Sequence, residues 1–196
     1  AFASEQGLDY LGTSFGGSSD LLAFWQSCGL QVVRAGLQQE ASSGEYPLQM
    51  IRGISPAGSE LAERIRQRLG AHWLTLLPAN WPALGPRLLA GITADLPSGP
   101  EPDNDDLRDL HNFANGHRGF QMTVPVLRTL SRTPGVMAWL ADQESLALWC
   151  RAVLQGRSWS SLQAEKLCRG QKDGEDRLRQ LLRDLFDDLL EKGPEL

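Results

Sequence analysis

Cysteine is scarce in this sequence of 196 residues, which contains only Cys28, Cys150 and Cys168 and no Cys-x-x-Cys pair. An odd and widely spaced set argues against the disulfide framework of small secreted proteins and indicates packing cysteines in a reducing compartment. No run of about 18 apolar residues occurs, so no transmembrane helix is predicted. The first residues also lack the charged and apolar regions of a signal peptide. We therefore expect a cytoplasmic location and no membrane partner.

Basic residues are too few for a protein that coats nucleic acid by charge alone. Lys and Arg total 19 against 24 Asp and Glu, a net charge of −5, whereas phosphate binding usually shows as a basic domain. A local basic face stays open, because net charge does not locate charges. With 41% hydrophobic residues, the chain can build one ordinary domain or two small ones. It starts with Ala1 and soon enters an apolar stretch, so we expect a piece of a longer protein.

The first 55 residues predict the order strand, helix, strand, strand. Residues 8–15 alternate apolar with small or polar side chains, the period of a half-buried strand. Gly16 to Ser19 then break the pattern, and a helix should run from there to about Ser27. Residues 30–37 and 45–54 predict two further strands, antiparallel to each other and joined by a polar loop.

From Ser55 onward the periodicity is helical. Ser at the N-cap followed by Pro56 is a favoured helix start. Residues 97–102, with three prolines and a glycine, are the best linker in the sequence. Further helices are expected at about 60–69, 73–77, 84–92, 103–115, 119–132, 135–141, 144–155, 158–168 and 174–192. The predicted fold class is α+β: a small sheet-containing part (1–55) followed by an all-helical domain (56–196).

Residues 21–30, Leu-Leu-Ala-Phe-Trp-Gln-Ser-Cys-Gly-Leu, resemble the Phe-Tyr-x-x-x-Gly-Phe pattern that closes GNAT-type acetyltransferase domains. The C-terminal half of that fold has the same order of strand, helix, strand, strand. Longer strings are similar to the bacterial tRNA(Met) cytidine acetyltransferase family. They lie at residues 9–16, 24–29, 34–36 and 40–46, and more loosely at 55–58, 105–107 and 113–118.

This resemblance implies a large enzyme with an ATP-hydrolysing module, an acetyltransferase domain and an RNA-binding tail. Such an enzyme uses acetyl-CoA and ATP to form N4-acetylcytidine at the wobble position of elongator tRNA(Met). The chain would hold the C-terminal part of the acetyltransferase domain and the tail. It lacks a Walker A loop and the Gln/Arg-x-x-Gly-x-Gly/Ala turn that holds the CoA pyrophosphate. We therefore expect no bound cofactor, no catalytic residue and no activity in this chain alone.

Two residues of the expected helix are candidates for acetyl-CoA binding. Asp20 lies where the family has an acidic residue associated with acetyl-CoA, and its alternative role is a first-turn carboxylate stabilised by the helix dipole. Ser27 lies where the family has an Arg that approaches the cofactor. Serine lacks that charge and its fork of donors, so a structural role is the alternative. Trp25 lies where many GNAT enzymes have a tyrosine that acts as general acid, and the indole of Trp25 cannot serve as a general acid.

Arg118, Arg128 and Arg132 are candidates for contact with tRNA phosphates, solvated helix faces being the alternative. Arg64, Arg66 and Arg68 form a second basic cluster, but their spacing spreads them around a helix. His72, His111 and His117 lack metal-ligand spacing, so no metal site is expected.

Two polar loops are weaker candidates. Gly16 to Ser19 resemble a phosphate-cradling turn, with a flexible turn as the alternative. Glu40 to Gly44 could face a substrate or form a hydrogen-bonded turn.

The alternative function is a helical RNA- or protein-binding module without catalysis. The edge of the sheet distinguishes the enzyme hypothesis from the binding-module hypothesis. Half of a GNAT sheet has an open edge that invites pairing, including dimer formation, whereas a self-contained module would cover it.

Overall fold

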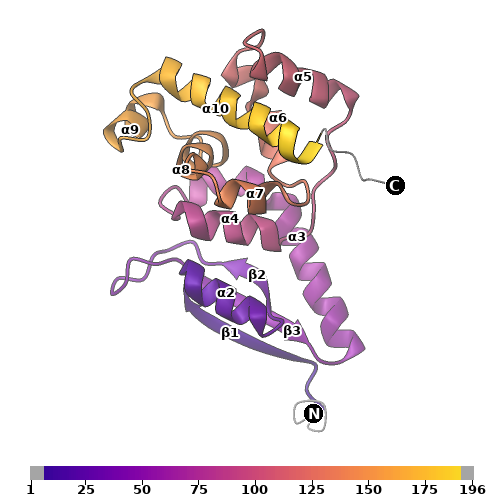
Figure 1. The fold of residues 1–196 in the computed structure, drawn as a ribbon. Coiled ribbons are helices and arrows are strands. Elements are labelled where there is room, and N and C mark those ends of the chain that lie inside the picture. The colour runs from indigo at the N-terminus through magenta and orange to yellow at the C-terminus, as the bar shows by residue number, and fades with distance from the viewer. Residues whose placement is uncertain (1–6, 191–196) are drawn as a thin grey trace.

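A computed structural model describes residues 7–190, apart from the side chain of Leu190. The elements follow in the order shown in Figure 1 and confirm the predicted α+β class. They are β1 (Tyr10–Gly16), α2 (Ser19–Ser27), β2 (Gln31–Ala35), β3 (Pro47–Gly53), α3 (Pro56–Asn80), α4 (Pro86–Asp95), α5 (Asn104–Ala114), α6 (Phe120–Leu130), α7 (Val136–Ala141), α8 (Leu146–Trp149), η1 (Cys150–Leu154), α9 (Trp159–Ala164), α10 (Gln171–Leu185) and η2 (Phe186–Leu190), where η marks a π-helix.

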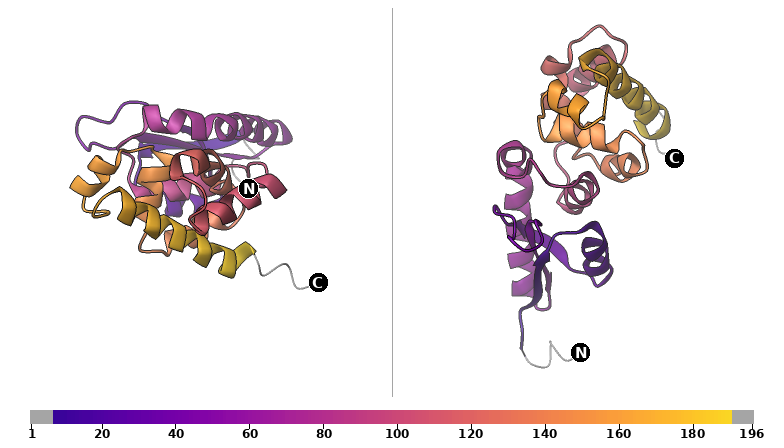
Figure 2. Two further views of the ribbon diagram at one scale, coloured as in Figure 1. Left: turned by 90° about the horizontal axis from the view of Figure 1, so that it is seen from above. Right: turned by 90° about the vertical axis from the view of Figure 1, so that its left-hand side faces the viewer.

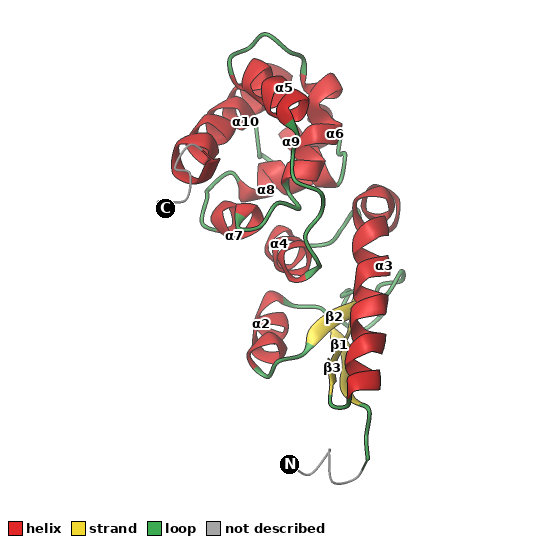
Figure 3. Ribbon diagram, turned by 90° about the vertical axis from the view of Figure 1, so that its right-hand side faces the viewer, coloured by secondary structure: helices red, strands yellow, loops and turns green. Residues whose placement is uncertain are grey.

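The three strands form one antiparallel sheet in the order β1-β3-β2. The predicted order of strand, helix, strand, strand is confirmed, as is the antiparallel pairing of β2 with β3. Along β1 the pairing runs without a break from Tyr10 opposite Gly53 to Gly16 opposite Pro47. On the other side the register shifts between Val32 and Arg34 of β2. The sheet lies between α2 and α3 (Figure 3).

Helix α3 is longer than the sequence pattern suggested. It begins as predicted, with the Ser55 hydroxyl accepting a hydrogen bond from the Gly58 amide at 3.1 Å. It then continues through residues 70–72 to Asn80. The prediction of a break at residues 70–72 was therefore wrong. A single buried stripe at spacings of three and four keeps the helix whole, since each turn contributes one residue to the core. Its members are Gly58, Ala62, Arg66, Gly70, Trp73 and Leu77.

Glycine is required at position 58, where α3 starts beside the end of the sheet. A Cβ at this position would overlap the backbone carbonyl of Asp9. The same carbonyl accepts hydrogen bonds from the amides of Ile54 and Ser55 at 2.8 and 3.1 Å. The close approach of two backbones therefore sets the direction in which α3 leaves the sheet.

The remaining helices extend the core away from the sheet. Figure 2 shows the sheet and α3 at one end of the molecule and α5 to α10 at the other, with α4 between them. Leu48 of β3, Trp73 of α3 and Trp149 of α8 are fully buried and belong to one continuous hydrophobic cluster. The division into residues 1–55 and 56–196 stays a prediction.

The last long helix begins three residues earlier than predicted, at Gln171. Its expected apolar stripe is buried at Leu178, Leu181, Leu182, Leu185 and Phe186, whereas Leu189 is 38% exposed. The last member of the stripe, Leu190, lies outside the described side chains. From Phe186 the helix changes to π-helical geometry.

The segment predicted as a linker is held in place. The Gly99 amide donates to the backbone carbonyl of Arg132 at 3.1 Å. In return, the Arg132 guanidinium donates to the carbonyls of Pro97 and Gly70. Residues 97–99 are therefore tied to both α3 and the end of α6, so this part of the segment is not a free connection.

All three cysteines are free thiols, in agreement with the packing role that the sequence predicts. Cys150 and Cys168 are buried and Cys28 is half-buried. Burial raises the pKa of the Cys150 thiol to about 12, so this group stays protonated and unreactive near neutral pH. Within residues 7–190, no helix combines the length and apolar character that crossing a membrane requires.

Candidate functional site

The two candidate cofactor residues lie at opposite ends of α2. Asp20 is exposed in the first turn, beside the N-cap residue Ser18. Ser27 is the last residue of the helix, and its hydroxyl donates to the Phe24 carbonyl at 2.7 Å. They are seven positions apart on the helix, which separates them by about 10 Å along the axis. The structure therefore does not bring the two together, and a cofactor role for either stays a prediction.

Apolar side chains cover the outer side of α2. Leu21 and Phe24 are 42% and 54% exposed and lie three residues apart, on one face of the helix. The Phe24 ring lies 5.0 Å from the Trp25 ring, which lies 6.4 Å from Phe15 of β1. The buried indole nitrogen of Trp25 has no hydrogen-bond partner among residues 7–190. An exposed apolar surface of this kind marks a region where another segment packs.

The strand beside this face has an open edge. β1 is at the end of the strand order and pairs with β3 alone within the described chain. None of its seven residues is buried, and Tyr10 is 48% exposed. Its outward backbone groups are therefore available to a further strand.

The opposite edge of the sheet is covered by side chains at Val32. The Val32 amide on β2 donates to the Asp95 carboxylate at 2.9 Å, and Arg66 donates to the Val32 carbonyl at 3.2 Å. Backbone groups that would otherwise need a strand partner are satisfied in this way. The sheet thus has an open border at β1, whereas the border at β2 is covered by side chains at Val32.

Asp95 is the centre of a buried polar network. Its carboxylate lies 2.6 Å from the Arg66 guanidinium, with the two side chains 8% and 5% exposed, and accepts from the Gln26 amide at 2.9 Å. It thereby connects α2, β2, α3 and α4. Sequence reasoning missed this network, because no local pattern relates residues 29 positions apart. Arg64 and Arg68 are exposed while Arg66 is buried, which confirms that the three do not share a face.

The three candidate RNA-binding arginines make separate contacts. Arg118 pairs with Asp109 at 2.9 Å. Arg128 is half-buried and donates from Nε to the Val153 carbonyl at 2.7 Å. Arg132 is 7% exposed and holds the 97–99 segment, as described above. Burial lowers the pKa of Arg128 and of Arg132. Their contacts do not join them into one basic cluster, and their role in RNA binding stays a prediction.

Arg128 lines a pocket of about 400 Å³ together with Arg157 and the half-buried Trp159. Arg157 is paired with Glu165 at 3.2 Å. For Arg128, no carboxylate lies within 4 Å in the described part of the chain. A pocket lined by an aromatic ring and by a guanidinium is suited to a nucleobase and its phosphate. Trp159 was not singled out from the sequence.

The glycine-serine turn before α2 borders a pocket. Gly17, Ser18 and Ser19 line it with Arg87 of α4 and the segment between α7 and α8, around a volume of about 650 Å³. The Ser18 hydroxyl is occupied as the helix cap. The turn therefore has a structural role in starting α2, and phosphate binding there stays a prediction.

The loop between β2 and β3 is closed by its own hydrogen bonds. The Gly44 amide donates to the Glu40 carbonyl at 2.8 Å, and the Glu45 amide donates to the Ser43 hydroxyl at 3.2 Å. These bonds match the hydrogen-bonded turn that was one of the two readings of this loop. Across residues 7–190, no group of three His, Cys, Asp or Glu side chains could hold a metal ion.

Comparison with known proteins agrees with this geometry. The family model described as GNAT acetyltransferase 2 matches residues 3–55, the segment that contains β1, α2, β2 and β3. The first part of the chain thus has the fold of the closing half of a GNAT-type acetyltransferase domain.

Curated relatives identify the family more narrowly. Proteins named tRNA(Met) cytidine acetyltransferase TmcA include one from Pectobacterium atrosepticum, 40% identical over 149 residues, which are 67% of this chain and 21% of the relative. The one from Nitrosococcus halophilus is 32% identical over 186 residues, 92% of this chain and 25% of the relative. The chain belongs to the tRNA(Met) cytidine acetyltransferase family. It spans about a quarter or less of the length of these relatives.

Proposed function

We propose that this chain is part of an RNA-modifying enzyme that uses acetyl-CoA and ATP to form N4-acetylcytidine at the wobble position of elongator tRNA(Met). Residues 1–55 belong to its acetyltransferase domain, and residues 56–196 form a helical tail that contacts the tRNA. The names of the relatives support the substrate, and the GNAT match supports acetyl-CoA as the donor.

The observation that carries the proposal is the open edge of β1 beside the exposed apolar face of α2. In a complete domain, further strands pair with β1 and the apolar side chains of α2 become buried. The chain itself has no Gln/Arg-x-x-Gly-x-Gly/Ala turn for the CoA pyrophosphate, so alone it neither binds acetyl-CoA nor transfers acetyl groups. The same edge also predicts that two copies of the chain pair through β1.

The first prediction concerns acetyl-CoA. A protein extended to the length of the relatives binds it in calorimetry, whereas the 196-residue chain gives no binding heat. In the extended protein, Asp20→Asn weakens binding about tenfold, a loss of about 1.4 kcal/mol. Asp105→Asn is the matched control, since Asp105 is also exposed in the first turn of a helix, and it should leave the affinity unchanged. An extended, folded protein that binds no acetyl-CoA would refute the enzyme assignment.

The second prediction concerns the tail. In the extended protein, Arg118→Glu combined with Arg128→Glu lowers tRNA affinity and reduces the salt dependence of binding by about one unit per lost phosphate contact. Arg169→Glu is the control for a general charge effect, because its side chain is 91% exposed. Equal affinities for the double variant and the control would remove Arg118 and Arg128 from the RNA surface.

The alternative, a helical module that binds RNA or protein without catalysis, predicts a different pair of results. The extended protein would then bind tRNA but no acetyl-CoA. The pocket that Arg128 shares with Trp159 is the observation that favours it.

A further inference from the structure

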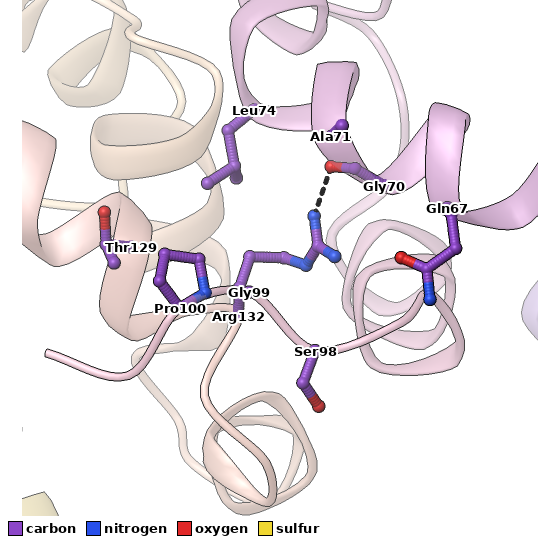
Figure 4. Close-up of a pocket in the computed structure, with 9 residues that line it drawn as sticks. All are labelled: Gln67, Gly70, Ala71, Leu74, Ser98, Gly99, Pro100, Thr129 and Arg132. Carbon is purple, nitrogen blue, oxygen red and sulfur yellow. Dashed lines mark hydrogen bonds between the residues drawn. The ribbon is translucent and has the colours of Figure 1, made fainter.

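Another pocket lies between α3, the segment 98–100 and the end of α6, with a volume of about 270 Å³ (Figure 4). Arg132 borders it from the end of α6, and Ser98 from the segment that Arg132 holds. Leu74 and Pro100 add apolar surface. Neither Asp nor Glu lines this pocket.

Arg132 brings an unusual charge to this pocket. The residue is only 7% exposed. Its two terminal nitrogens donate to the carbonyls of Gly70, at 2.6 Å, and Pro97. Across the described residues no carboxylate lies within 4 Å of it. The carbonyl dipoles hold the guanidinium in place but do not neutralise it.

Arg66 is the instructive comparison, because it is buried to the same degree at 4% exposure. Its charge is matched by Asp95 at 2.6 Å, whereas Arg132, which has no such carboxylate among the described residues, lines a cavity. Burying an ion without a partner is costly, and buried charges in proteins are normally paired. The missing partner of Arg132 is therefore expected to come from outside the chain.

We propose that this pocket binds a phosphate group, with Arg132 as its charged donor. A planar guanidinium matches the oxygens of a phosphate. Two glycines leave room for the Arg132 side chain: a Cβ at Gly70 would lie 3.0 Å from its Nη2, and one at Gly99 would lie 2.8 Å from its Cβ. The apolar wall suits the organic part of a phosphate ester. This proposal deepens the proposed contact of the helical tail with tRNA, and phosphate binding by the chain is measured without acetyl transfer.

The test adds inorganic phosphate to the 196-residue chain and measures its binding by ³¹P NMR. The wild type should show saturable binding in the millimolar range, and phosphate should raise its melting temperature. Ser98→Asp places a carboxylate in the pocket and should weaken phosphate binding at least tenfold while leaving the fold intact, since Ser98 is exposed. Ser98→Asn, of nearly the same size, should bind within about threefold of the wild type.

A competition experiment identifies the source of the phosphate group. If a short single-stranded RNA displaces inorganic phosphate from the wild type, the natural ligand is an RNA backbone phosphate. If RNA leaves the signal unchanged and adenosine monophosphate displaces it, the ligand is a small phosphate ester. No saturable binding up to about 10 mM phosphate, or equal binding by the Asp and Asn variants, would overturn the proposal and leave Arg132 as a clamp for the 97–99 segment.

Discussion

Asp95→Ala is expected to lower the free energy of unfolding by about 3 to 5 kcal/mol, because it leaves the buried Arg66 charge without a partner. It also removes the acceptor for the Val32 amide and the Gln26 side chain. Urea denaturation measures the change as a lower midpoint at an unchanged slope.

Two control variants isolate the cause. Asp105→Ala removes a carboxylate that pairs with Arg108 at 3.0 Å, but those side chains are 79% and 69% exposed, so the expected loss is about 1 kcal/mol or less. Replacing both partners, Arg66→Met with Asp95→Leu, should recover much of the stability. If Asp95→Ala costs no more than Asp105→Ala, the buried network does not stabilise the fold.

The same denaturation curves test the division into residues 1–55 and 56–196. Asp95 and Arg66 lie on the helical side of that boundary, and Val32 and Gln26 lie on the other. A single transition that shifts as a whole would indicate one cooperative unit. Two separate transitions would support the two-domain division.

Trp73→Ala should lower the free energy of unfolding by about 3 to 5 kcal/mol, since truncation leaves a large cavity. Trp73 is completely buried on α3, its ring lies 5.0 Å from that of Trp81, and its indole nitrogen donates to the Thr93 hydroxyl at 2.9 Å. Thermal and urea unfolding both measure the loss.

Controls on the same helix separate packing from the hydrogen bond. Trp73→Phe keeps most of the ring and should lose much less stability than the alanine variant. Leu76→Ala, at a residue 41% exposed, should cost little. A Trp73→Ala protein as stable as the Leu76→Ala protein would show that the contact between α3 and α4 is not part of the stabilising core.

Local signals explain why the element order could be predicted. Side-chain caps act within four residues, and both Ser55 and Asp103 cap the helices expected from them. The alternation of apolar with small or polar side chains predicted β1. The aromatic motif that ends in a glycine predicted α2. The prediction of a break inside α3 was wrong because burial of Gly70 and Trp73 on one stripe holds the helix together. Such burial depends on neighbours that are distant in sequence.

The candidate site could be predicted less well. Asp20 and Ser27 were correctly placed on one helix, but the length of that helix separates them. Arg132 was expected on the surface and is buried. Its partners Gly70 and Pro97 lie 62 and 35 positions away, and no sequence pattern relates residues at those distances.

The sequence by itself determined the order of the elements, their caps and the family to which the chain belongs, because these depend on short-range patterns and on matching strings of residues. Only the tertiary structure decided which strand edge is open, which arginine is neutralised by Asp95 and which one faces an unfilled pocket. Those outcomes depend on packing between segments far apart in the chain, where burial removes water and makes every unpaired charge or backbone group costly.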